Sequence, residues 1–141
     1  MAGFFGGAAD AAAALSPREA LEHLLKGAAL LDIREPYETN YRVLDVPKAI
    51  HIPNNALMDR YAEIPRDAPL VVLDNVGVRS KEVARFLLEK GIVDVAWIVG
   101  GVVDWVREGL PLRVDPNYEL VGQCSCKLRP KNPKDVPKWK K

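Results

Sequence analysis

The sequence predicts a single α/β domain with a mostly parallel central sheet of about five strands and helices on both faces. Its 141 residues suit one domain of ordinary size. Hydrophobic residues make up 48% and charged residues 28%, the balance of a globular protein. Short apolar runs alternate along the chain with segments of helical periodicity. Because neighbouring parallel strands need crossover connections, which are usually helices, this alternation favours a parallel sheet covered on both faces.

The first predicted helix begins after Ser16. Ser16 suits the N-cap position, Pro17 the first helical position, and Glu19 completes a capping box. Gly27 is expected to end the helix. Three leucines at helical spacing form its apolar face: Leu21, Leu24 and Leu25.

Four short apolar runs are predicted to be buried strands, and the third is rich in β-branched residues. They span residues 29–33, 49–52, 70–73 and 95–99. Residues 80–90 are predicted to be a helix that buries Val83, Phe86 and Leu87 and ends at Gly91. A last helix is predicted over 102–108, before Gly109 and Pro111.

The two ends of the chain differ in composition from its middle. Residues 1–14 are small and are expected to be a flexible N-terminus, so the predicted domain covers 15–113. Residues 114–141 form a C-terminal extension whose tail, 127–141, has seven basic side chains against Asp135 alone, a net charge of +6. The basic residues are Lys127, Arg129, Lys131, Lys134, Lys138, Lys140 and Lys141. Three prolines and like-charge repulsion favour an extended tail, which either solubilises the chain or binds an acidic protein partner.

Composition also excludes several classes of protein. No run approaches the ~20 apolar residues of a membrane span, and the N-terminus lacks a basic residue before Arg18, so it makes a poor secretory signal. The net charge of +1 gives no global bias toward nucleic acid. The only two cysteines, Cys124 and Cys126, are too few for a disulfide framework. We therefore expect a cytoplasmic protein that binds no nucleic acid.

The loop over residues 74–80 is the predicted functional site, because it leads from a buried strand directly into a helix. In α/β sheets, ligands bind at the carboxyl ends of the strands. Such a loop turns backbone N–H groups inward and adds the helix dipole, which makes a cradle for a small anion. Gly77 permits the turn, and Arg79 is placed to close the cradle with its guanidinium. The loop consists of Asp74, Asn75, Val76, Gly77, Val78, Arg79 and Ser80.

Four sequence blocks together resemble the rhodanese-homology domain, a family of sulfurtransferases. The blocks are 31–38 (LDIREPYE), 46–53 (VPKAIHIP), 77–80 (GVRS), and 99–105 with 109–112 (VGGVVDW and GLPL). The resemblance implies a rhodanese-like α/β fold over about 15–113 and places the active site in the loop at 74–80. It also implies that Asp32 is structural and bonds the backbone or Arg34.

The sequence departs from the family at the position that does the chemistry. By resemblance, an active loop reads Cys-x-x-Gly-x-Arg-Ser, which puts Asp74 at the position of the cysteine. Asp45 and Lys48 also stand where the family often has His and Gly. A carboxylate cannot accept sulfane sulfur as a persulfide. We expect Asp74 to accept the N–H groups of the loop itself, and to pair with Arg79.

The resemblance therefore implies a rhodanese-like protein that lacks thiosulfate sulfurtransferase activity and acts as a binding or regulatory module. Family members with Asp or another residue in place of the cysteine act in this way. Two other interpretations remain open for Asp74: a nucleophile in phosphoryl transfer, and a mimic of an anionic state of the site. Phosphoryl transfer usually needs a metal and further carboxylates, which this loop does not offer.

A different class of function rests on Cys124 and Cys126, which follow the domain as a Cys-x-Cys pair beside Lys127. They are candidate working thiols of a sulfur relay, a strained disulfide or a soft-metal ligand pair, or else ordinary thiols. Two cysteines do not fill a metal site. His23 and His51 lie on a helix and a strand without ligand-like spacing, so neither a metal nor a cofactor is expected.

Overall fold

The computed structural model describes residues 12–120 and 128–130. Contacts between Cα atoms divide the chain into two compact units, each described here by itself. The first unit comprises Met1–Arg34 and Val46–Pro111, and the second comprises Glu35–Asp45 and Leu112–Lys141. The second unit joins two segments that are far apart in sequence, because residues 42–44 pair with residues 112–114.

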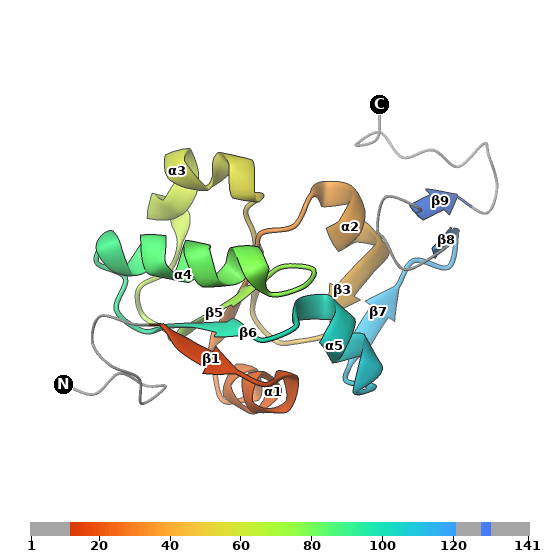
Figure 1. Ribbon diagram of the computed structural model, residues 1–141, viewed down its shortest axis with the longest axis horizontal. Coiled ribbons are helices and arrows are strands. Elements are labelled where there is room, and N and C mark those ends of the chain that lie inside the picture. Colours follow the sequence, from red (N-terminus) through yellow and green to blue (C-terminus); the bar gives the residue numbers. More distant parts are fainter. Residues whose placement is uncertain (1–11, 121–127, 131–141) are drawn as a thin grey trace. The chain divides into compact units, whose positions relative to one another are not determined.

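The first unit is built on a five-stranded sheet in which every pair of neighbours is parallel, in the order β1-β6-β5-β2-β4. Figure 1 shows α1 and α5 on one side of this sheet and α3 and α4 on the other. The predicted fold class, an α/β domain with a central parallel sheet of five strands and helices on both faces, is confirmed. The strands are β1 (Ala13–Leu15), β2 (Ala29–Asp32), β4 (Ala49–His51), β5 (Leu70–Leu73) and β6 (Val95–Ile98).

The inner strands are continuous apolar runs because helices cover both of their faces. Every residue of β2 and of β5 is buried, including Asp32 at the end of β2. At the sheet edge, β4 has no buried residue. The four runs predicted as strands are all strands of this sheet, each within a residue or two of its predicted bounds.

Helix α1 (Pro17–Leu25) begins with the predicted capping box. The Ser16 hydroxyl accepts the Glu19 N–H at 3.2 Å, and the Glu19 carboxylate accepts the Ser16 N–H at 3.0 Å. The buried residues of the helix are Pro17, Ala20 and Leu24. Leu25, predicted to lie on the apolar face, is 62% exposed, because the buried stripe follows Ala20 and Leu24 instead.

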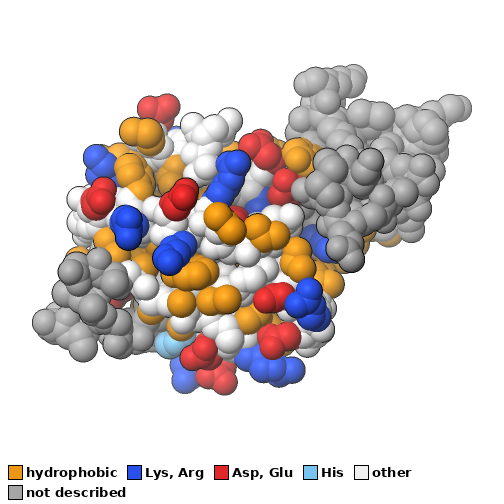
Figure 2. Space-filling view, viewed as in Figure 1, with side chains coloured by type: hydrophobic (Ala, Val, Ile, Leu, Met, Phe, Trp, Pro, Cys, Tyr) orange, Lys and Arg blue, Asp and Glu red, His pale blue; other side chains and the backbone are white. Residues whose placement is uncertain are grey.

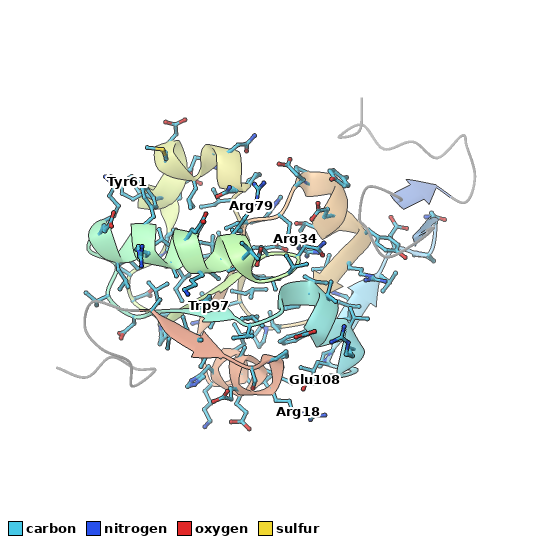
Figure 3. All side chains as sticks on the ribbon, viewed as in Figure 1. Arg18, Arg34, Tyr61, Arg79, Trp97 and Glu108 are labelled. Carbon is cyan, nitrogen blue, oxygen red and sulfur yellow. The ribbon has the colours of Figure 1, made fainter. Side chains whose placement is uncertain are left out.

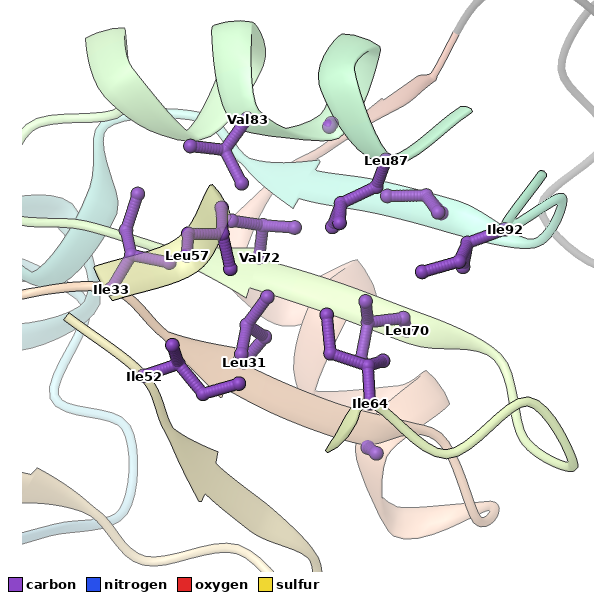
Figure 4. Packing of buried hydrophobic residues seen from close by; sticks show 13 residues of the cluster. Leu31, Ile33, Ile52, Leu57, Ile64, Leu70, Val72, Val83, Leu87 and Ile92 are labelled. Carbon is purple, nitrogen blue, oxygen red and sulfur yellow. The ribbon is translucent and has the colours of Figure 1, made fainter. Parts of the chain in front are cut away.

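Helix α4 (Val78–Glu89) forms the main core with the sheet. It buries Ser80, Val83, Ala84 and Leu87, a helical spacing that directs one stripe onto the strands. Figure 4 shows Val83 and Leu87 above Val72 and Leu31 of the two central strands. On the other side of the sheet, α5 (Gly101–Arg107) buries Trp105, whose ring N–H donates to the Pro111 carbonyl at 2.9 Å.

Several short elements of the first unit were not predicted. β1 lies partly within the segment expected to be flexible, and it is ordered by pairing with β6, with Ala14 beside Trp97. Its three residues are alanine and leucine, which do not favour a strand by themselves. The connection between β4 and β5 also carries short helices: η1 (Asn54–Ala56), α3 (Leu57–Arg60) and η2 (Tyr61–Glu63).

The second unit contains one short helix and two antiparallel strand pairs. Helix α2 (Pro36–Tyr41) leads into β3 (Arg42–Leu44), which pairs with β7 (Leu112–Val114). The Asp115 N–H extends this pairing by donating to the Tyr41 carbonyl at 2.8 Å. β8 (Tyr118–Leu120) pairs with β9 (Leu128–Pro130).

Candidate functional site

The loop from Asp74 to Gly77 leaves the sheet at the carboxyl end of its middle strand. β5 ends at Leu73, and α4 begins at Val78. Leu73 lies in register with Asp32 of β2, and its carbonyl accepts the Ile33 N–H at 3.0 Å. The loop and the segment that follows β2 therefore share one edge of the sheet, where ligands of α/β proteins bind.

The carboxylate of Asp74 fills the inside of the loop. One of its oxygens accepts the Gly77 N–H at 2.7 Å and the Ser80 hydroxyl at 2.5 Å, and the other accepts the Arg79 N–H at 3.1 Å. Asp74 is 6% exposed and Ser80 is fully buried. The loop thus directs two backbone donors and one hydroxyl at a single buried anion, which belongs to the chain itself.

Helix α5 holds the opposite side of the same loop. The carbonyl of Asp74 accepts the Val102 N–H, and the carbonyl of Asn75 accepts the Val103 N–H, both at 3.1 Å. These bonds engage the first two carbonyls of the loop, while the later N–H groups of Gly77 and Arg79 face the carboxylate. A side chain at Gly101 would collide with the Asp74 carbonyl oxygen and with the backbone of Asn75. The helix can approach this closely only because Gly101 has no Cβ.

Gly77 makes the turn from the loop into α4. Its φ is +92°, a left-handed conformation that side chains disfavour. A Cβ at this position would lie 2.8 Å from the backbone nitrogen of Gly100 and 3.2 Å from the Ile98 carbonyl oxygen. Glycine is therefore required at position 77 for two reasons: the left-handed backbone angle, and the close approach of other backbone atoms.

Arg79 takes part in the site through its backbone rather than its side chain. The sequence predicted a guanidinium that closes the cradle, but the Arg79 side chain is exposed. Within the described part of the chain, no ion pair joins it to Asp74. The expected N–H groups of Asn75, Val76 and Val78 likewise do not bond the carboxylate, whose donors are the Gly77 N–H, the Arg79 N–H and the Ser80 hydroxyl.

A buried ion pair stands beside the loop at the end of β2. The Arg34 guanidinium binds the Asp32 carboxylate through two bonds, of 2.9 and 2.7 Å, and the Arg34 N–H donates to it at 3.1 Å. Both side chains are almost fully buried. The Arg34 carbonyl oxygen lies 2.8 Å from Nε2 of His51 on β4. The predicted bond between Asp32 and Arg34 is therefore confirmed.

In the first unit, neither histidine bonds the Asp74 carboxylate. His23 lies on α1 and His51 on β4, both partly buried. Asp45 belongs to the second unit, where its carboxylate lies 3.7 Å from Arg113. Cys124 and Cys126 lie outside the described residues. No group of metal-ligating side chains is found in the described ranges.

Sequence reasoning missed the part of the site that α5 contributes. The pair Gly100-Gly101 directly after a buried strand is a signal for close backbone approach. That signal does not say which segment approaches. The contact with Asp74 and Asn75 depends on how β5 and β6 lie side by side, so only the folded chain shows it.

No helix among the described residues is long and apolar enough to cross a membrane.

Comparison with known proteins agrees with this architecture. The model of the rhodanese-like domain family matches residues 16–108. Thiosulfate sulfurtransferase GlpE of Haemophilus influenzae is 34% identical over 105 residues, which is 74% of this chain and 95% of that protein. The sulfurtransferase of Allochromatium vinosum is 34% identical over 83 residues, 59% of this chain and 76% of that protein.

Solved structures show the same fold. The solution structure of the polysulfide-sulfur transferase homodimer from Wolinella succinogenes has a TM-score of 0.66 and 25% identity, covering 79% of this chain and 85% of that chain. A rhodanese-related protein from Thermoplasma volcanium has a TM-score of 0.65 and 25% identity, covering 73% and 99%. The chain therefore belongs to the rhodanese-like domain family.

Proposed function

We propose that this chain is a binding or regulatory module of the rhodanese-like family that does not transfer sulfur at the loop 74–80. The observation that carries the proposal is the buried carboxylate of Asp74, bonded by Gly77, Arg79 and Ser80. By its resemblance to the family loop, Asp74 stands where an active member has the cysteine. The chain's own anion takes the donors that would otherwise stabilise a bound one.

The chemistry of sulfur transfer supports this proposal. In the family's reaction with thiosulfate, a thiolate attacks the sulfane sulfur, the S–S bond breaks, and sulfite leaves with the bonding electron pair. Cyanide then attacks the outer sulfur of the persulfide, thiocyanate forms, and the thiolate is regenerated. A carboxylate oxygen is a poor nucleophile toward sulfur and forms no stable counterpart of the persulfide. With Asp74 at this position, the loop has donors for an anion but no sulfur acceptor.

A thiosulfate:cyanide sulfurtransferase assay of the full chain tests the proposal. We expect thiocyanate formation at the level of the reaction without protein. The matched control is the double variant Cys124→Ser with Cys126→Ser, which should behave in the same way. Turnover that survives in the double variant would contradict the proposal, because no cysteine would then remain.

A sulfur relay is the second candidate function. It is favoured by two thiols close in sequence and by relatives that are named sulfurtransferases. In this case Cys124 or Cys126 would accept the sulfane sulfur. Turnover in the native chain that disappears in the double variant would establish the relay and exclude a purely binding role.

A further inference from the structure

A second feature of the first unit lies on the outer side of the loop, between α4 and the end of β6. It is a hollow of about 610 Å³, and we call it the α4–β6 groove. Its apolar part is formed by four side chains: Val76, Val78, Trp97 and Val99. Figure 2 shows hydrophobic side chains gathered beside α4 on this face, next to Lys and Arg side chains of the helix.

The groove exposes an unusual share of apolar surface. The exposed fractions are 54% for Val76, 65% for Val78 and 42% for Val99. Among the described residues, seven large apolar side chains are exposed to this degree or more. Three of the seven thus line one hollow. Because these valines are about half exposed, the hollow is open, unlike small-molecule pockets, which enclose most of their ligand. An open apolar groove is typical of a surface that binds a peptide segment.

The charges at the rim come from one face of α4. Lys81 and Arg85 are one turn apart and both line the groove, together with Glu82. Both cations are exposed, and in the described part of the chain neither forms an ion pair. The rim therefore carries two cations and one carboxylate, and this net positive charge favours an acidic partner.

The groove is distinct from the inside of the loop. Asp74 and Ser80 do not line it, and in the view of Figure 3 the Trp97 and Arg79 side chains lie on opposite sides of α4. Charge also argues against occupation by the chain's own C-terminal tail, since residues 127–141 carry a net charge of +6. Lys81 and Arg85 would repel this segment.

We propose that the α4–β6 groove binds an acidic peptide segment of a partner protein. A branched aliphatic or aromatic side chain of that segment packs between Val78 and Trp97, and a neighbouring Asp or Glu pairs with Lys81 or Arg85. The inference deepens the proposed binding function, on which it rests, by naming the surface and the chemistry of the partner.

Selection from a random phage-displayed peptide library against the full chain tests this inference. We expect enriched peptides in which Asp or Glu flanks Leu, Ile, Val, Phe or Trp. The dissociation constant of a synthetic enriched peptide is then measured by fluorescence polarisation. Reversing both charges, Lys81→Glu with Arg85→Glu, should weaken binding by about tenfold or more. Val78→Asp should weaken it similarly, since its charge lies in the apolar part.

The matched control is Arg18→Glu, which reverses an exposed charge on α1 and should leave affinity unchanged. All three variants change exposed side chains, so each should unfold close to the temperature of the native chain. Enrichment of basic peptides, or equal affinity for native chain and double variant, would overturn the inference. Self-association that is lost in Val78→Asp would also overturn it, because a second copy would then fill the groove.

The peptide-binding experiment and the sulfurtransferase assay can fail independently of each other. Peptide binding by a chain that also transfers sulfur would contradict the inactivity of the loop and leave the groove in place. An inactive chain that selects no acidic peptide would contradict the groove alone.

Discussion

The Asp74 carboxylate and its three donors form a closed set inside the loop, with Ser80 fully buried beneath it. Replacing Asp74 by Ala would leave the Gly77 and Arg79 N–H groups and the Ser80 hydroxyl without this acceptor. We expect the free energy of unfolding to fall by about 1–3 kcal/mol, the typical cost of buried donors left unpaired. Urea denaturation of the native chain and of Asp74→Ala measures this difference.

The matched control is Asp67→Ala, which removes an exposed aspartate and should cost much less. Sulfate adds a second readout, because it can replace the missing anion only in the vacated loop. At constant ionic strength, sulfate should raise the midpoint temperature of Asp74→Ala more than that of Asp67→Ala. An equal response of the two variants would show that the loop is no anion cradle.

A thiol in place of the carboxylate tests whether one residue silences the site. In a background of Cys124→Ser with Cys126→Ser, Asp74→Cys supplies the only thiol. Backbone N–H donors and the N-terminus of α4 should lower the pKa of that thiol below its usual range. We expect it to take sulfur from thiosulfate, with release of sulfite, and to appear as a persulfide by mass spectrometry.

Asp74→Ser in the same background is the control and should gain no sulfur. A folded Asp74→Cys variant with an ordinary thiol pKa and no persulfide would show that the donors do not form the family's cradle. The changes at Asp45 and Lys48 would then be the next positions to restore.

At the residue scale, the sequence predicted which residues belong to the site more accurately than it predicted the bonds of their side chains. Asp74 and Gly77 were identified from a strand that runs directly into a helix, and Asp32 with Arg34 from a family block. The side chain of Arg79 was placed wrongly. Spacing in a loop fixes the backbone of a residue near a site, but a long side chain is free to turn to solvent.

Among the elements, α1 carries a titratable cap. Hydrogen bonds from the backbone and then the side chain of Ser16 hold the pKa of Glu19 below its usual range. A carboxylate with a lowered pKa in the folded state adds stability above its unfolded pKa, and this stability is lost as the pH falls through the folded value. Relative to Glu19→Gln, the native chain should be more stable at neutral pH. The two should converge as the pH falls through the lowered pKa of Glu19 in the folded chain.

The variant Ser16→Ala removes the N-cap hydroxyl and keeps the charge of Glu19. Loss of the N-cap hydroxyl should lower the free energy of unfolding by about 1 kcal/mol. It should also reduce the effect of Glu19→Gln on stability, because Ser16 and Glu19 form the capping box together. Urea denaturation between acid and neutral pH measures all four chains. An effect of Glu19→Gln that is the same in both backgrounds would contradict this coupling.

Elements that carry their own local signal were predictable, and those ordered by distant partners were not. α1 has a cap and α4 has an apolar stripe, and β5 is an apolar run with two adjacent valines. In contrast, β1 is an alanine-rich triplet that becomes a strand through its pairing with β6. β3 and β7 are also three residues long and lie far apart in sequence. Local propensity cannot specify such pairs.

At the scale of the whole molecule, charge is distributed unevenly along the chain. The tail 127–141 carries +6, and the overall charge of +1 leaves −5 for residues 1–126. The chain thus has two basic features, the α4–β6 groove and the tail, which differ in their apolar content. The α4–β6 groove combines two cations with an apolar floor on a folded surface. The tail combines many cations with prolines and few apolar side chains, which suits an acidic partner of loose sequence requirement.

The two features predict opposite responses to the same pair of probes. Poly-L-glutamate, which is acidic without apolar side chains, should bind through the tail. Replacing Lys131, Lys134, Lys138, Lys140 and Lys141 by Gln lowers the tail's charge from +6 to +1 while sparing β9. This variant should lose most of its binding to poly-L-glutamate but keep its affinity for a groove-selected peptide.

Exposed charges are screened over about 10 Å at 0.1 M salt, so tail binding should also weaken steeply with salt. The matched control, Lys81→Glu with Arg85→Glu, should show the reverse pattern. If the tail variant bound poly-L-glutamate as tightly as the native chain at low and high salt, the tail would act only to solubilise the protein.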